Sequence, residues 1–181
     1  MEIQPLKVAA LSAGERARVA LALALGKRPR LVLLDEPFAS LDPLAGRELL
    51  QLLMDGVAEL GATVIVASHV VADIQRICDH IVLLSGGRVR LEGDVEELLE
   101  SHRLLTGPRR PLGSIRGVRE VVRERYSGRQ LTLLAITEGP IVDPSWTVDP
   151  VSLEELLLAY MAPERLPAPR TTEGVPLRWH G

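Results

Sequence analysis

The chain has 181 residues, 46% of them hydrophobic, which is enough to fill the core of one ordinary domain or of a smaller domain with an appendage. This composition excludes an intrinsically disordered chain, and the near balance of 21 basic and 24 acidic residues gives no indication of a nucleic-acid-binding protein. The single cysteine, Cys78, excludes an internal disulfide and a zinc cluster, so we expect a buried thiol and a reducing compartment.

No apolar run approaches the roughly 18 to 20 residues that span a bilayer. The longest candidates, 19–25 and 62–67, are far shorter, and the N-terminus lacks the pattern of a signal peptide. We therefore expect a cytoplasmic chain whose contact with a membrane comes through a partner.

The first predicted helix begins at a capping box, in which Ser12 and Glu15 each satisfy a backbone N–H of the other. Its body, residues 16–25, is rich in Ala, Leu and Arg, and Gly26 is suited to end it. Residues 31–34 form a continuous apolar run, which predicts a strand buried on both faces of a parallel sheet.

Asp42 and Pro43 predict the start of a second helix, since aspartate is a good N-cap and proline suits the first turn. An apolar stripe follows until Gly61 and consists of Leu49, Leu50, Leu53, Val57 and Leu60. A strand at 62–67 and a helix at 70–78 come next. The alternation of strands and helices predicts right-handed parallel crossovers.

The remaining sequence predicts smaller elements. Strands at 81–84 and 88–91 flank a glycine-rich turn, and Asp94 is expected to cap a helix that runs to Ser101. A second hairpin is expected at 118–125 and 130–136, and an amphipathic helix at 152–161. We accordingly divide the chain into a first domain (1–101), a Gly/Pro-rich linker (102–116), a small appendage (117–162) and a mobile tail (163–181).

Two groups of residues are candidates for binding polyphosphate. Asp35 and Glu36 end a predicted strand, and ligands of open parallel sheets lie beyond the carboxyl ends of the strands. Ser12, Ala13 and Gly14 open a helix whose first N–H groups have no partner within the helix, which favours an anion. Arg16, Arg18, Arg28 and Arg30 are interpreted as solvated or subunit-facing charges.

Four segments together resemble the second half of the ATPase domain of ABC-type transporters. They are Leu11-Ser12-Ala13-Gly14-Glu15, Leu31-Val32-Leu33-Leu34-Asp35-Glu36-Pro37, Ser40-Leu41-Asp42 and Ser68-His69, which resemble the signature motif, the Walker B segment, the D-loop and the switch histidine. The resemblance implies an α/β fold, namely the C-terminal part of a P-loop NTPase parallel-sheet domain with a small α+β appendage. Gly139, Pro140, Trp146 and residues 152–155 look like the extension of some bacterial exporter ATPases.

The resemblance also implies roles for these residues. Asp35 would hold Mg²⁺ through a water molecule, and Glu36 would be the general base that orients the attacking water. His69 would sense the γ-phosphate of ATP. Ser12, Gly14 and Glu15 of the signature and Asp42 of the D-loop would act on nucleotide across a pair of subunits, with Ala13 and Glu15 replacing the glycine and glutamine that are usual there.

No P-loop is present among the 181 residues. Its pattern requires Gly-Lys-Ser/Thr, whereas the chain has two lysines, Lys7 and Lys27, and Arg28 follows the latter. We expect an ATP-binding and ATP-hydrolysing subunit of an ABC-type membrane transporter, present as a portion that is inactive alone. Its expected partners are a second ATPase subunit in a head-to-tail dimer and transmembrane permease subunits, which would hold it at the inner face of the cell membrane.

Two other interpretations remain open. The ABC-type ATPases of DNA repair and chromosome packing also favour glutamate at the fifth position of the signature, as Glu15 is here. A shortened, inactive regulator that pairs with a full ATPase subunit is the non-enzymatic alternative.

Overall fold

The computed structural model describes residues 10–109 and 115–161, so the predicted tail at 163–181 lies outside the described part. Contacts divide the described residues into two compact units, one made of 10–81 with 93–97 and the other of 82–92 with 98–161. None of the helices in these ranges is long and apolar enough to cross a membrane.

The described part of the first unit contains helices α1 (Ala13–Gly26), α2 (Pro43–Leu60) and α3 (Val71–Ile77) and a two-stranded sheet formed by β1 (Leu31–Asp35) and β2 (Thr63–Ala67). The predicted helix starts are confirmed, because Ser12 caps α1 in a capping box and Asp42 caps α2. Helix α2 ends at Gly61, whose φ of 60° lies in the left-handed region that favours glycine.

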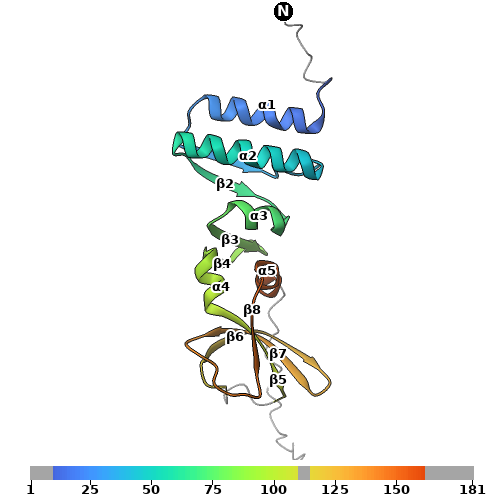
Figure 1. Ribbon diagram of the computed structural model, residues 1–181, viewed down its shortest axis with the longest axis vertical. Helices are drawn as coiled ribbons and strands as arrows, with labels where there is room; N and C mark the ends of the chain where they lie inside the picture. Colours follow the sequence, from blue (N-terminus) through green and yellow to red (C-terminus); the bar gives the residue numbers. More distant parts are fainter. Residues whose placement is uncertain (1–9, 110–114, 162–181) are drawn as a thin grey trace, which may run out of the picture. The chain divides into compact units, whose positions relative to one another are not determined.

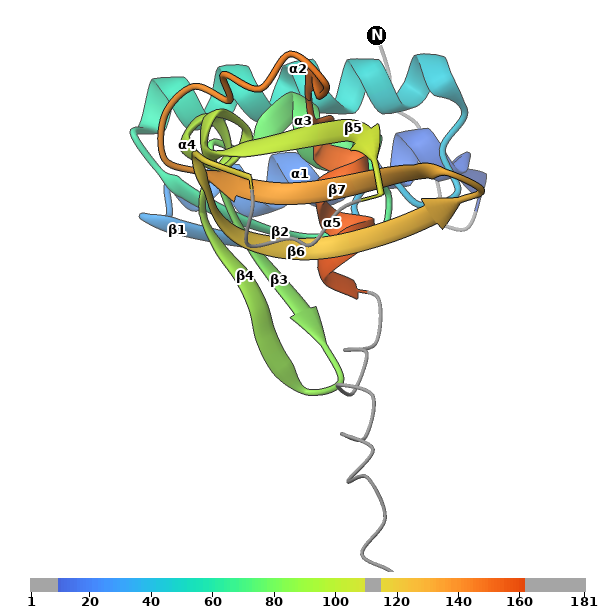
Figure 2. The same cartoon turned by 90° about the horizontal axis from the view of Figure 1, so that it is seen from below.

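Strands β1 and β2 pair in parallel, as the alternation of elements predicted. Figure 1 shows β2 below α2, and Figure 2 shows β1 next to β2. The register aligns Leu31 with Thr63 and Asp35 with Ala67, so the carboxyl ends of the two strands lie side by side. Residues that follow Asp35 and Ala67 are therefore brought to the same edge of the sheet, although α2 separates them in the sequence.

The core of the first unit lies on one face of this sheet. Leu21 of α1 and Leu49 and Leu53 of α2 are buried together, with Leu34 and Val64 of the strands packed against them. The opposite face is exposed, with 50% of Leu31, 68% of Leu33 and 56% of Ile65 accessible. The expectation of a first strand buried on both faces is therefore wrong within the described residues, because α1 and α2 pack on one side of the sheet only.

Strands β3 (His80–Ser85) and β4 (Arg88–Asp94) form the predicted hairpin. Its turn residues, Gly86 and Gly87, have φ values of 59° and 70°, the pair of positive angles that a two-residue turn of type I′ requires. Asp94 caps helix α4 (Val95–Ser101) by accepting from the backbone of Glu96 and Glu97, as predicted.

The second unit holds a four-stranded antiparallel sheet with the order β6-β7-β5-β8. Figure 2 shows three of these strands, β6, β7 and β5, next to one another. Its elements are β5 (His102–Pro108), β6 (Val118–Ser127), β7 (Gln130–Thr137), β8 (Thr147–Pro150) and α5 (Leu153–Met161). Strands β6 and β7 confirm the predicted second hairpin, and α5 confirms the predicted C-terminal helix. The turn between β6 and β7 contains Gly128 at a φ of 59°.

Strand β5 occupies residues that the sequence assigned to a linker. It is central in the sheet, pairing with both β7 and β8, and its Leu105 belongs to a core with Leu131 and Leu133. Gly107 in this strand is required by packing rather than by flexibility, because a Cβ placed on it would lie 2.6 Å from the ring of the buried Trp146.

Candidate functional site

Glu36 and His69 meet at the carboxyl edge of β1 and β2. The Glu36 backbone N–H donates to the carbonyl of Ala67 over 2.8 Å, which continues the pairing of the strands by one residue. His69 donates twice to Oε1 of Glu36, from its Nδ1 at 2.6 Å and from its backbone nitrogen at 3.0 Å. The hydroxyl of Ser68 is 3.4 Å from the other carboxylate oxygen, Oε2. The backbone of Glu36 has a φ of 46°, uncommon for a residue other than glycine.

This contact changes the proton affinity of both groups. The hydrogen bond from His69 lowers the pKa of Glu36 below its ordinary value, and the charge of His69 acts in the same direction. The carboxylate in turn raises the pKa of His69, with a smaller contribution from Asp73. The imidazole side chain is 78% exposed and the carboxylate 35%, so the pair is accessible to a ligand and to solvent screening.

Asp35 is the last residue of β1 and is exposed. Within residues 10–109 and 115–161, no group of three or more His, Cys, Asp or Glu side chains is arranged to hold a metal ion by itself. The donor set nevertheless suits Mg²⁺, which prefers oxygen ligands and is usually held by one or two carboxylates together with the phosphates of a substrate. Asp35 supplies such a carboxylate at the end of β1.

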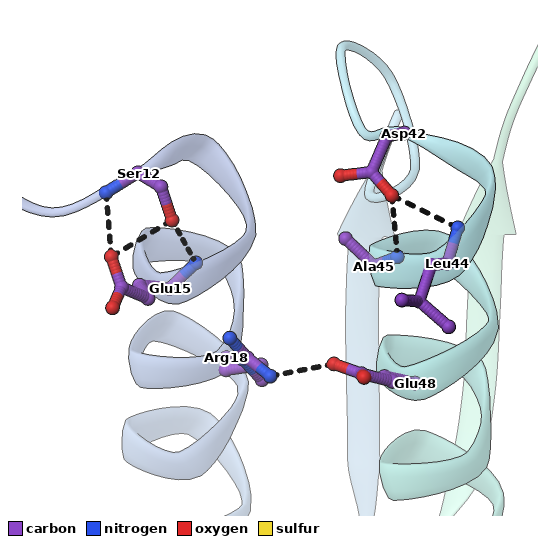
Figure 3. Close-up of polar contacts among 7 residues, drawn as sticks. All are labelled: Ser12, Glu15, Arg18, Asp42, Leu44, Ala45 and Glu48. Carbon is purple, nitrogen blue, oxygen red and sulfur yellow. Dashed lines mark hydrogen bonds and ion pairs between the residues drawn. The ribbon is translucent and has the colours of Figure 1, made fainter.

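The start of α1 carries a closed capping box (Figure 3). The carboxylate of Glu15 accepts from the backbone N–H and the hydroxyl of Ser12, each at 2.8 Å, and the backbone of Glu15 donates to the Ser12 hydroxyl over 3.3 Å. These bonds, the one from the Ser12 backbone above all, lower the pKa of Glu15. Glu15 is therefore an ionised part of the helix cap.

Asp42 plays the same part for α2. Its Oδ1 accepts from the backbone of Leu44 at 2.9 Å and of Ala45 at 3.0 Å, and these two bonds, that of Ala45 first, lower the pKa of the Asp42 carboxyl (Figure 3). The capping role that the Asp-Pro pattern predicted is thus present in the structure.

Two cavities connect the candidate residues of the first unit. A hollow of about 260 Å³ is lined by Ser12 and Gly14 from the start of α1 and by Asp42 from the start of α2. A larger cavity of about 610 Å³ is lined by Asp42 and His69. Asp42 therefore borders both, whereas Asp35, Glu36 and Glu15 line neither of these two cavities.

Two contacts in this region were not predicted from the sequence. Arg18, interpreted above as a solvated or subunit-facing charge, is bonded within the chain to Glu48 of α2 at 2.7 Å. Ala45 faces Gly14, since a Cβ placed on Gly14 would lie 3.1 Å from the Cβ of Ala45. Both contacts join helices that are separate in the sequence, so no local pattern could reveal them.

The sequence is similar to a family model and to proteins of known function. Residues 2–71 match the family model described as "AAA domain, putative AbiEii toxin, Type IV TA system". The molybdenum import ATP-binding protein ModC of Rhodopseudomonas palustris (strain HaA2) is 34% identical over 166 residues, covering 86% of this chain and 42% of the relative. The thiamine import ATP-binding protein ThiQ of Jannaschia sp. (strain CCS1) is 42% identical over 96 residues, covering 53% of this chain and 42% of the relative.

A solved structure, described as that of the ATP binding subunit of an ABC transporter, is 34% identical, with a TM-score of 0.45 over 51% of this chain and 38% of the other. The chain thus spans 42% of the length of both curated relatives. The names of these relatives refer to import, whereas the C-terminal residues of this chain suggested a likeness to exporter ATPases.

The predicted α/β class is confirmed. The described residues form one parallel sheet, β1-β2, and two further sheets, β3-β4 and β6-β7-β5-β8. The chain is a homologue of the ATP-binding subunits of ABC transporters.

Proposed function

We propose that this chain supplies part of the ATP-hydrolysing machinery of an ABC-type membrane transporter. The observation that carries the proposal is the Glu36–His69 pair at the shared carboxyl edge of the parallel strands β1 and β2. Ligands of open parallel sheets lie at this edge, and phosphoryl transfer depends on positioning and on stabilisation of charge there.

In this proposal Glu36 is the general base. Its Oε1 already accepts both short bonds from His69, whereas Oε2 has a longer contact, 3.4 Å from the Ser68 hydroxyl. We therefore assign to Oε2 the contact with the attacking water, while His69 keeps the carboxylate ionised and fixes its orientation. Because the imidazole is largely exposed, its other nitrogen is available to a γ-phosphate.

Asp35 is the residue that would hold Mg²⁺ together with ATP, through a water molecule. A magnesium ion bound there would neutralise the charge of the phosphates, which the carboxylates of Asp35 and Glu36 would otherwise repel. Ser12, Gly14 and Glu15 at the start of α1, with Asp42 across the hollow, would serve the nucleotide of a second subunit.

The proposal includes the assembly. We propose a head-to-tail pair with a second ATPase subunit and association with permease subunits, which would place the chain at the cytoplasmic side of a membrane. ModC and ThiQ, named as import ATP-binding proteins, support this assignment by homology. We further propose that the 181 residues alone are inactive, since they contain no Gly-Lys-Ser/Thr sequence to hold the phosphates.

Complementation in trans tests this proposal. The partner is a full-length, P-loop-bearing homologue whose own signature serine has been changed to arginine, so that productive turnover requires a signature from elsewhere. Adding the wild-type chain should restore Mg-ATP hydrolysis, and adding a Ser12→Arg chain should not. Equal hydrolysis with both chains, or none with either, would contradict the proposed function.

A further inference from the structure

We propose that Arg18 and Glu48 are positioning residues, which hold the signature turn of α1 level with the D-loop turn of α2 so that the two turns act as one rigid unit. This inference rests on the proposed function for its consequence in catalysis. The observation behind it is the 2.7 Å contact between Nη1 of Arg18 and Oε2 of Glu48, drawn in Figure 3.

The position of the pair along the two helices carries the argument. Arg18 lies six residues after the N-cap Ser12, and Glu48 lies six residues after the N-cap Asp42. A bond between equivalent positions of two helices places their N-terminal ends at the same level, as Figure 3 shows. A shift of α1 by one residue along its axis, about 1.5 Å, would move the guanidinium away from the carboxylate.

A second contact fixes the separation of the helices. Gly14 and Ala45, in the first turns of α1 and α2, approach so closely that a Cβ on Gly14 would lie 3.1 Å from that of Ala45. The glycine thus brings the helix starts together, and the ion pair one turn further on sets their offset. Further along the two helices, Leu21 of α1 and Leu49 of α2 are buried in the same apolar cluster.

Both charged side chains also line the hollow of about 260 Å³ that separates Ser12 from Asp42. The pair therefore lies in the wall of the space that the signature and D-loop residues share. It is partly exposed, with 42% of the Arg18 side chain and 45% of the Glu48 side chain accessible, so it adds little to overall stability. A contact of this kind acts on geometry more than on folding.

The reaction is sensitive to such geometry. Phosphoryl transfer relies on groups held in place before the reaction, and a misplacement of about 1 Å lowers a rate by on the order of a hundredfold. Separating Arg18 from Glu48 should thus impair the contribution of Ser12 to a nucleotide held by another subunit, while leaving the binding of ATP by that subunit almost unchanged.

The test uses charge reversal in the full chain. Arg18→Glu and Glu48→Arg each place like charges together, and the double variant Arg18→Glu/Glu48→Arg restores the pair with opposite polarity. Lys27→Glu, at the C-cap of α1, and Glu59→Arg, in the last turn of α2, change exposed residues and are the matched controls for net charge. Each chain is added to the P-loop-bearing partner described above, and kcat and KM for ATP are measured together with the thermal midpoint of the chain.

We expect each single reversal to lower kcat by on the order of ten- to a hundredfold, with KM changed by less than about threefold. The double reversal should recover most of the loss, and the thermal midpoints of all variants should agree within about 2 °C. Single reversals that leave kcat unchanged, or a double variant no better than the singles, would overturn the inference.

Hydrogen exchange on the chain alone, without nucleotide, separates failure of the inference from failure of the proposed function. Both single reversals should speed exchange in the first turns of α1 and α2, and the double reversal should slow it again. If exchange follows this pattern but the wild-type chain gives no hydrolysis, the proposed function fails and the pairing stands. If exchange is the same in all variants, the positioning role is overturned whatever the hydrolysis assay gives.

Discussion

The Nδ1 atom of His69 lies 2.6 Å from Oε1 of Glu36, although the two residues are 33 positions apart in the sequence. The parallel pairing of β1 with β2 brings them together, since Asp35 and Ala67 occupy the same level of the sheet. A proton shared in this bond links the ionisation of the two side chains, and the link can be measured.

The titration of His69 is the first prediction. Replacing Glu36 by glutamine removes the main cause of the raised histidine pKa, which should fall back toward its ordinary value of 6.5. Asp73→Asn is the matched control and should lower it less, because Asp73 contributes the smallest effect. NMR of the imidazole protons follows the titration. An unchanged His69 pKa in the Glu36→Gln chain would show that the bond is absent in solution.

The same pair predicts a pH dependence of stability. The contribution of Glu36, whose pKa is lowered, is present above pH 4.5 and lost as the pH falls through the lowered value. That of His69, whose pKa is raised, is complete below pH 6.5 and lost as the pH rises through the raised value. The difference in denaturant midpoint between wild type and Glu36→Gln should therefore be largest between pH 4.5 and 6.5. A difference that grows steadily above pH 8 would contradict this assignment.

The role of Glu36 in turnover is tested in a version of the chain that carries a P-loop segment at its N-terminus. Glu36→Gln should keep nucleotide binding, because Asp35 remains, and should lose single-turnover hydrolysis, because an amide does not take up a proton from water. Rapid-quench measurement with a single equivalent of Mg-ATP gives the rate. Hydrolysis close to the unsubstituted rate would remove Glu36 from the role of base.

Binding of nucleotide by the 181 residues alone is predicted to be weak. The P-loop that supplies N–H donors and a lysine to the phosphates is not in the sequence, and Asp35 and Glu36 carry negative charge. Calorimetric titration of the monodisperse chain with Mg-ATP measures the affinity. Micromolar binding that Asp35→Asn abolishes would contradict this prediction, because it would show that these residues hold the phosphates without a P-loop.

Packing at Gly107 predicts a loss of stability in the second unit. Gly107→Ala drives a Cβ into the ring of Trp146, which is 5% exposed, and should cost about 1–3 kcal/mol. Gly46→Ala is the control, because it lies within α2 with no atom nearby and should stabilise the first unit by up to about 1 kcal/mol. Denaturant unfolding compares the two. Equal stability of wild type and Gly107→Ala would mean that Trp146 is not packed on β5.

Local patterns predicted much of the fold. Ser12 with Glu15, and Asp42 with Pro43, marked the starts of α1 and α2, because a cap is decided by side chains within three residues of the helix end. Both hairpins were predicted from the glycines in their turns, because a tight turn needs positive φ angles that glycine adopts easily. The candidate residues Glu36 and His69 were also found from the sequence, through motifs at the ends of apolar runs.

The rest depends on contacts between distant segments. The bond from His69 to Glu36 requires the register of β1 with β2, and the pair of Arg18 with Glu48 requires the offset of two helices. Strand β5 was missed because Gly107 and Pro108 are typical of a linker, whereas the glycine is needed there to make room for Trp146. Such requirements arise only after the chain is packed.

The uncovered apolar face of β1 and β2, formed by Leu31, Leu33 and Ile65, affects how this chain will behave in spectroscopy. Anilinonaphthalene sulfonate binds exposed apolar surface and is commonly used to detect a loosened core. The folded chain offers such surface while its helices and strands are intact, so it should brighten the dye in its native state. Denaturant should then dim the dye rather than brighten it, and a strong signal at the outset would be a property of the native sheet.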